Sequence, residues 1–156
     1  MGAALLAEFN RLELMESAVG VGGPLMQAQG CRSLFEMERL AVMGLVEPLK
    51  RLPELLRMRG SLARQLAESN IDLFIGIDAP DFNLGLEEKL RALGVPVIHL
   101  VSPSVWAWRK KRINKIKRSV DLMLTLFPFE LDIYQQHDIP AVCICPLYTS
   151  PSPRDA

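Results

Sequence analysis

The segment 71–83 joins an isoleucine-rich apolar run to two carboxylates, Asp78 and Asp81. Such a run predicts a strand over 71–77 that is buried on both faces, as in a parallel sheet. Asp78 would then follow the carboxyl end of that strand, and ligands bind at this edge of open α/β sheets. A carboxylate in this position serves either a ligand or the cap of a helix, so the two roles must be told apart.

Strand and helix patterns alternate along the chain, which predicts an α/β fold with a Rossmann-like parallel sheet flanked by helices. Strands are expected over 18–21, 71–77, 95–101, 120–126 and 141–145, and helices over 2–11, 24–29, 45–66, 84–93, 106–118 and 128–136. A chain of 156 residues can bury a core, and one domain is expected over 1–145 with its first strand missing. Residues 146–156 abandon the pattern and predict a non-native or disordered tail, such as a sequencing read-through would add.

The composition is that of a globular chain, since the formal net charge is zero and 49% of the residues are hydrophobic. No apolar run reaches the ~18 residues of a membrane-spanning helix. The first residues lack the basic start of a signal peptide. The three cysteines, Cys31, Cys143 and Cys145, lack metal-site spacing, and a reducing cytosol is the default expectation. Cys143 and Cys145, two apart on one face of an expected strand, are expected to be buried thiols.

Asp78 is a candidate general base. Pro80 stiffens the turn after it, and a carboxylate held there could take a proton from an attacking hydroxyl. Structural aspartates are common in turns, so spacing alone leaves this role open. Asp81 either serves the ligand as well or caps a helix that starts near Phe82, because aspartate is a preferred N-cap residue.

The loop after the strand expected over 95–101 lies at the same sheet edge as Asp78. It holds both tryptophans, Trp106 and Trp108, which point to one side if the loop is extended. They form either a hydrophobic plug on the core or a wall for a sugar or acyl group. The candidate hydrogen-bond donors beside them are Ser102 and Ser104. His99, inside the strand, is expected to be a core histidine with satisfied hydrogen bonds.

Basic residues crowd the helix expected over 106–118, among them Arg109, Lys110 and Lys111. Such a run is usually a solvated helix face. It could instead bind nucleic acid, a phosphate group or an anionic membrane. No nucleic-acid motif accompanies the run, and the neutral overall charge argues against a dedicated nucleic-acid binder.

An apolar stripe at helical spacing runs along the helix expected over 45–66. The stripe and the residues that widen it are Leu45, Val46, Leu49, Leu52, Leu55 and Leu56. Such a stripe usually faces a core. Lysines and arginines flank this one, however, and an apolar surface rimmed by basic residues suits an anionic bilayer surface.

Five motifs together resemble the lipid-A-disaccharide synthases, a family of bacterial glycosyltransferases. They are GGPLMQAQG at 22–30, MERLAVMG at 37–44, GIDAPDFN at 76–83, VSPSVWAWR at 101–109 and LFPFE at 126–130. The resemblance implies the N-terminal half of a GT-B glycosyltransferase, truncated at both ends. It implies transfer of 2,3-diacylglucosamine from a UDP-linked donor to 2,3-diacylglucosamine 1-phosphate. The products are UDP and the β-1,6-linked disaccharide precursor of lipid A and lipopolysaccharide.

The resemblance also implies roles for single residues. Asp78 matches the family's proposed catalytic base, which would deprotonate the 6-hydroxyl of the acceptor. Asp81 and Asn83 would orient that hydroxyl or hold the turn. The other implied substrate-binding residues are Ser102, Ser104, Trp106, Trp108 and Arg109. The apolar stripe would receive acyl chains, and Arg109 with its basic neighbours could meet the acceptor phosphate or anionic lipid headgroups.

The resemblance places such an enzyme peripherally on the cytoplasmic side of the inner membrane of Gram-negative bacteria. Its partners would be the acylated donor and acceptor and the anionic lipid surface, with no nucleic acid and no metal cofactor. The chain departs from the family where Cys145-Pro146 replaces a Gly-His motif. It also lacks the opening Gly-Glu-x-Ser-Gly-Asp loop and the UDP-binding C-terminal domain, so this polypeptide alone is expected to be inactive.

Two rival functions remain open from the sequence. The first is a non-catalytic module that binds nucleic acid or another anionic partner through the basic helix. The second is a Rossmann-like enzyme of other chemistry, such as a nucleotide-sugar epimerase. The absence of a dinucleotide-binding glycine fingerprint weighs against the second.

Overall fold

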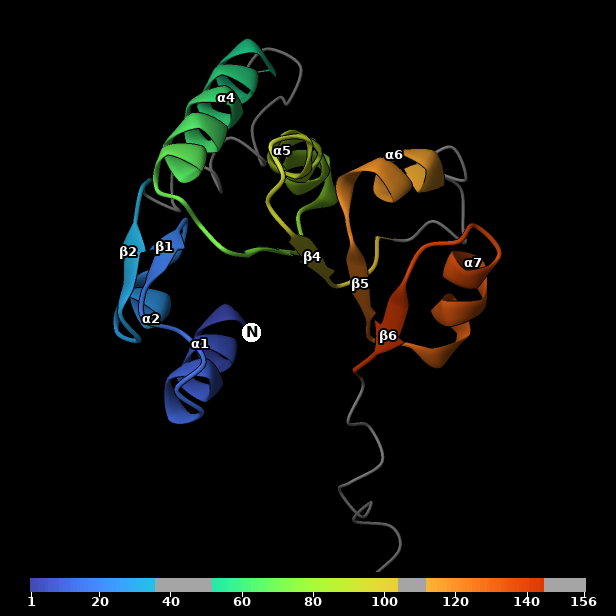
Figure 1. Ribbon diagram of the computed structural model, residues 1–156, viewed down its shortest axis with the longest axis horizontal. Helices are drawn as coiled ribbons and strands as arrows, with labels where there is room; N and C mark the ends of the chain where they lie inside the picture. The colour runs from blue at the N-terminus through green and yellow to red at the C-terminus, as the bar shows by residue number, and fades with distance from the viewer. Residues whose placement is uncertain (36–51, 104–111, 145–156) are drawn as a thin grey trace, which may run out of the picture. The chain divides into compact units, whose positions relative to one another are not determined.

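The computed structural model describes residues 1–35, 52–103 and 112–144, and the chain divides into two compact units, Met1–Asn70 and Ile71–Ala156. In the first unit the elements are α1 (Gly2–Arg11), β1 (Ala18–Gly20), α2 (Pro24–Gln27), β2 (Cys31–Ser33) and α4 (Leu52–Glu68). Strands β1 and β2 pair in parallel, with Ala18 opposite Cys31 (Figure 1). Pro24 occupies the first turn of α2, where its missing N–H costs no hydrogen bond.

The second unit is a four-stranded parallel sheet in the order β3-β4-β5-β6. Its strands are β3 (Phe74–Ile77), β4 (Val97–Leu100), β5 (Leu122–Thr125) and β6 (Ala141–Cys143). The crossovers contain α5 (Pro80–Ala92), α6 (Arg112–Ser119), and the 3-10 turn η1 (Pro128–Glu130) with α7 (Leu131–Gln135). Because sequential strands are spatial neighbours, the carboxyl ends of β3, β4 and β5 meet at one edge of the sheet.

Helices α5 and α6 lie side by side in the second unit (Figure 1). The buried hydroxyl of Ser119 joins them, because it donates to Leu84 O at 2.9 Å and Lys115 O at 2.8 Å. The core beneath these helices includes Leu90, Val97, Ile116 and Met123, none of which is exposed. The apolar side chains of these helices and of the sheet therefore form the interior of this unit.

A polar network joins the amino-terminal end of β4 to the helices. Asp121 accepts hydrogen bonds from Arg91 Nε at 2.8 Å and from the backbone N–H of Val97 at 2.9 Å. Arg91 also donates to Lys117 O at 2.8 Å. These bonds satisfy backbone groups at a helix end and a strand start, so they fix the end of the sheet opposite the Asp78 edge.

The structure confirms the α/β class, with parallel sheets flanked by helices. It corrects the sequence analysis at β2, which was not predicted because Cys31-Arg32-Ser33 is short and has no apolar alternation. The predicted extent of one domain over 1–145 stays a prediction, as does the character of 146–156, since 145–156 lies outside the described residues. No helix in the described ranges is long and apolar enough to cross a bilayer.

Candidate active site at the carboxyl edge of the sheet

The chain turns sharply at Asp78 and Ala79, directly after β3. Both residues are exposed, and both adopt left-handed backbone conformations, with φ angles of 52° and 44°. This conformation costs a residue with a Cβ roughly 1–2 kcal/mol. Residues held in such conformations cluster at active sites and ligand clamps, so the observed strain marks this turn as a candidate functional site.

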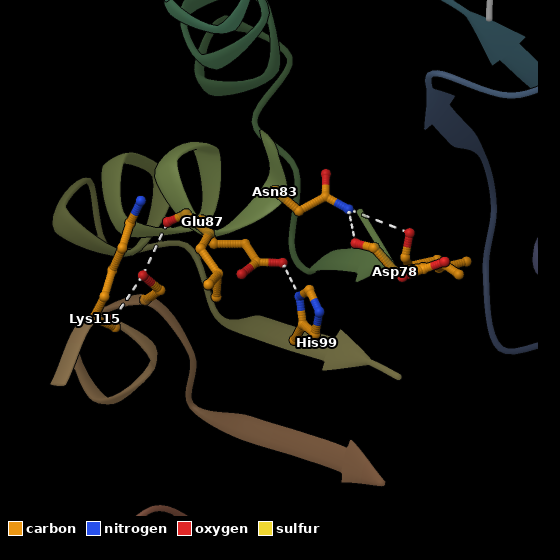
Figure 2. Close-up of polar contacts among 8 residues, drawn as sticks. Asp78, Asn83, Glu87, His99 and Lys115 are labelled. Carbon is orange, nitrogen blue, oxygen red and sulfur yellow. Dashed lines mark hydrogen bonds and ion pairs between the residues drawn. The ribbon is translucent and has the colours of Figure 1, made fainter. Parts of the chain in front are cut away.

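Hydrogen bonds from both flanks hold the turn (Figure 2). The side-chain amide of Asn83 donates to Asp78 O at 2.7 Å and to Ile77 O at 3.3 Å. The backbone N–H of Asp78 donates to Leu100 O, at 2.9 Å, on the neighbouring strand. The backbone of Asp78 is thus tied to α5 and to β4, while its exposed carboxylate accepts no side-chain hydrogen bond within the described residues.

Asp81 does not cap helix α5, so this alternative from the sequence is wrong. The helix begins at Pro80, the N-cap residue is Ala79, and no side chain caps the helix. The helix can start this early because proline is favoured in the first turn. Asp81 lies in that turn, where a negative charge is favourable, and forms an ion pair with Arg112 of α6.

Ser102 lies after β4 at the same edge, and its hydroxyl already has protein partners. Ser102 Oγ and the hydroxyl of buried Tyr134 are 2.6 Å apart, and Oγ also donates to Pro103 O at 3.2 Å. Burial, opposed by the Ser102 hydrogen bond and reinforced by the charge of Glu130, raises the pKa of Tyr134 to about 12. The phenol therefore stays protonated and anchors Ser102 to α7.

The backbone also turns left-handed immediately after β4. Val101 has a φ of 78°, which is rare for a β-branched residue, and its N–H donates to Leu124 O at 3.0 Å. Two neighbouring strands thus end in strained turns, at Asp78 and at Val101, on one sheet edge. The sequence predicted that these strand ends lie at the same edge of the sheet, but not the conformation of either turn.

A buried acid–histidine pair lies beneath the Asp78 turn, and the sequence analysis missed it. Glu87 of α5 and His99 of β4 are both fully buried, with Oε1 and Nδ1 2.6 Å apart (Figure 2). The remaining atoms, Glu87 Oε2 and His99 Nε2, are buried without a hydrogen-bond partner in the described part of the chain. The expectation of a fully satisfied core histidine is therefore met only at Nδ1.

Gly76 makes room for this pair. A Cβ on Gly76 would lie 1.9 Å from Glu87 Oε1 and 3.3 Å from His99 Nδ1. Gly76 also stands opposite His99 in the strand register. A glycine inside a buried strand often marks a close approach of another group, so Gly76 was the one available sequence signal for the pair.

Several predicted site residues cannot be placed. Ser104, Trp106, Trp108, Arg109, Leu45, Val46 and Leu49 lie outside the described residues, as do the side chains of Leu52 and Leu55. Leu56 of α4 is described and is 45% exposed, which is high for a large apolar side chain. Of the three cysteines, Cys31 is buried, which raises its thiol pKa, Cys143 is half-buried, and Cys145 is not described.

The arrangement suits proton transfer to or from a bound ligand. An exposed carboxylate stands at the ligand-binding edge of a parallel sheet, with its backbone held on both sides. The described ranges contain no group of three or more His, Cys, Asp or Glu side chains that could hold a metal ion. Among the placed candidates, Asp78, Asp81 and Asn83 lie within one turn and helix start, and Ser102 lies on the adjacent strand end.

Comparison with known proteins gives one consistent family. Residues 1–145 match the family model described as Lipid-A-disaccharide synthetase. The lipid-A-disaccharide synthase of Azotobacter vinelandii is 56% identical over 140 residues, which are 90% of this chain and 37% of the relative. That of Saccharophagus degradans is 57% identical over 140 residues, 90% of this chain and 36% of the relative. That of Pseudomonas aeruginosa is 62% identical over 122 residues, 78% of this chain and 32% of the relative. The chain thus spans about a third of the length of these relatives.

Proposed function

This chain belongs to the lipid-A-disaccharide synthetase family, and from that membership we propose that it is the acceptor side of a lipid A glycosyltransferase. The reaction would move 2,3-diacylglucosamine from its UDP-linked donor to 2,3-diacylglucosamine 1-phosphate. A β-1,6 bond forms between the acceptor's 6-oxygen and the donor's anomeric carbon, and UDP leaves. The 6-hydroxyl loses its proton in this step, so the reaction needs a base.

Asp78 is the proposed base, and the observation that carries this role is its place on a strained, doubly anchored turn. The left-handed backbone at Asp78 and Ala79 presents the carboxylate to solvent at the ligand edge. Asn83 and Leu100 hold the backbone, so the carboxylate can meet an incoming hydroxyl without reorganising the turn. Asp81, whose carboxylate is paired with Arg112, is less available for proton transfer.

The test of this role uses a full-length chimera, in which the matched residues of this chain replace those of the Azotobacter vinelandii relative. The isosteric change Asp78→Asn removes the proton acceptor and keeps the size of the side chain. We expect turnover to fall by about 100-fold or more, with donor binding and the circular dichroism spectrum unchanged. Near-normal turnover of the Asp78→Asn chimera would remove Asp78 from the mechanism.

The lipid substrates suggest where the enzyme works, and we propose peripheral binding to the cytoplasmic face of the inner membrane. The supporting observation is α4, on which Leu56 is 45% exposed and the next residue, Arg57, is also exposed. An apolar side chain beside a cation suits the boundary between acyl chains and anionic headgroups. The leucines earlier in the stripe would extend this contact surface.

Two further proposals concern the polypeptide itself. Because the chain corresponds to little more than a third of its relatives, we propose that it is inactive alone, and UDP release by the isolated chain would contradict this.

Nucleic-acid binding through α6 has less support. In the described part of that helix, Arg112, Lys117 and Arg118 form ion pairs with Asp81, Asp138 and Glu88.

A further inference from the structure

The buried pair of Glu87 and His99 has a position that packing alone does not explain. A carboxylate on the core face of a helix loses its hydration, and this costs several kcal/mol unless partners replace the water. Here one carboxylate oxygen has a partner, and Oε2 has none within the described residues. Replacing such a pair by apolar residues is often neutral or stabilising, so its presence calls for a role other than stability.

The pair lies where three elements that frame Asp78 come together. Glu87 is on α5, which begins two residues after Asp78, and His99 is on β4. The carboxylate of Glu87 lies against Gly76 of β3, two residues before Asp78. Glu87 Oε1 and His99 Nδ1 share a hydrogen bond across the helix–sheet interface, and the imidazole tautomer decides which group donates.

We propose that Glu87 and His99 are a positioning pair for Asp78, an inference that rests on the proposed role of Asp78 as base. Their hydrogen bond fixes how closely α5 approaches the sheet, with the carboxylate seated over Gly76. That approach sets the path of the Asp78–Ala79 turn, because the turn connects β3 directly to α5. Without the pair, α5 shifts on the sheet and the left-handed turn relaxes away from its productive geometry.

Two different substitutions break the pair in the full-length chimera. Glu87→Met keeps most of the side-chain volume and removes the hydrogen-bond partner of His99. Gly76→Ala leaves both partners unchanged but places a Cβ 1.9 Å from Glu87 Oε1, so the carboxylate must move. Glu87→Gln can still form the hydrogen bond with His99 Nδ1, because its amide both accepts and donates. Glu88→Met is the matched control, because Glu88 is the next residue of α5 and pairs at the surface with Arg118.

For Glu87→Met and Gly76→Ala we expect kcat to fall about tenfold or more, with KM for donor and acceptor within about twofold. Glu87→Gln should restore kcat to within about threefold of the parent, and Glu88→Met should leave it unchanged. A defect that is only structural would lower the amount of folded enzyme. A folding measurement that does not depend on activity reports that amount. A change of KM alone, or an unchanged kcat in folded Glu87→Met and folded Gly76→Ala, would overturn the proposal.

A second arm tests whether the pair acts through Asp78. In the Asp78→Asn background, Glu87→Met should lower the residual turnover by less than about twofold, because the group that it positions is already lost. The same fold-loss in both backgrounds would show an independent effect and overturn the positioning role. The two proposals fail differently. Full turnover of Asp78→Asn would rule out the role of Asp78 as base. A large loss of turnover in Asp78→Asn, with unchanged turnover in Glu87→Met, would rule out only the positioning role of Glu87 and His99.

Discussion

The side-chain amide of Asn83 donates a 2.7 Å hydrogen bond to the backbone oxygen of Asp78, and so the first turn of α5 holds the turn that leads into the helix. The same amide reaches Ile77 O at 3.3 Å, so a single side chain satisfies two carbonyl groups at the strand end. This contact converts a flexible strand-to-helix connection into a defined turn. Its removal gives the first prediction.

Asn83→Ala should loosen the Asp78 turn. We expect the free energy of unfolding of the chain to fall by about 1–2 kcal/mol, because two carbonyls, one in a part-buried and one in an exposed hydrogen bond, lose their donor. Turnover of the full-length chimera should fall about tenfold, with KM little changed. Urea denaturation and steady-state kinetics measure the two effects. Asn114→Ala on the exposed surface of α6 is the control, and equal effects of both substitutions would contradict the role of Asn83.

Ala79→Gly should stabilise the chain, which is unusual for a change to glycine. Ala79 is exposed and left-handed, with a φ of 44°, so glycine removes the Cβ strain at that residue. We expect a gain of roughly 0.5–1 kcal/mol in the free energy of unfolding, after the entropy cost of glycine is subtracted. Ala67→Gly, in the last turn of the right-handed helix α4, should instead destabilise. Urea denaturation compares the two variants, and losses of similar size would argue against a strained turn.

Tyr134→Phe should reduce the loss of stability at high pH. The folded chain raises the pKa of Tyr134 from 10.0 to about 12, so the folded state holds this proton more tightly than the unfolded state. The resulting stability is complete below pH 10 and is lost as the pH rises to about 12. The loss amounts to about 2–3 kcal/mol.

The measurement for Tyr134 is the free energy of unfolding in urea from pH 8 up to about pH 12. At neutral pH, Tyr134→Phe should cost about 1 kcal/mol because the hydrogen bond to Ser102 is lost. Ser102→Ala removes the same hydrogen bond but keeps the phenol, so this variant should retain the alkaline loss. Parallel pH profiles for the parent chain and Tyr134→Phe would show that Tyr134 does not cause the loss.

Leu56→Glu should weaken retention of the chain on liposomes of anionic phospholipid. Leu56 is 45% exposed, and transfer of its side chain into the bilayer boundary would contribute on the order of 1–2 kcal/mol, or roughly tenfold in binding. Co-sedimentation with vesicles measures the partition. Leu93→Glu is the matched control, since Leu93 is 64% exposed at the end of α5. Equal losses for both variants would mean that α4 is not the contact.

The second unit was largely predictable because its strands are apolar runs and its first helix ends at a glycine signal. The predicted strands at 71–77, 95–101 and 120–126 contain β3, β4 and β5, and Gly94 ends α5 with a φ of 87°. The start of α5 was missed. The prediction began the helix at Leu84, after the polar residues of its first turn, whereas Pro80 already starts it.

The candidate site was predictable in its location and not in its contacts. The position of Asp78 at a strand end follows from the apolar run before it. The pairing of Glu87 with His99 does not, because hydrophobic periodicity carries no information on which polar side chains meet inside a core. Ser102 illustrates the same limit, since a hydroxyl beside a candidate site gave no sign of its bond to Tyr134.

Gly76 and Glu87 impose an order on the changes that this protein can accumulate. A methyl group at position 76 would overlap the carboxylate, so Gly76→Ala displaces Glu87 for as long as that side chain is present. If Glu87 is first replaced by a shorter residue, an alanine at position 76 no longer meets the carboxylate, and its contact with His99 Nδ1 at 3.3 Å remains. Once alanine is established there, a return to glutamate at position 87 meets the same overlap. The order of substitutions therefore matters, because the residue present at one position determines which substitutions the other can accept.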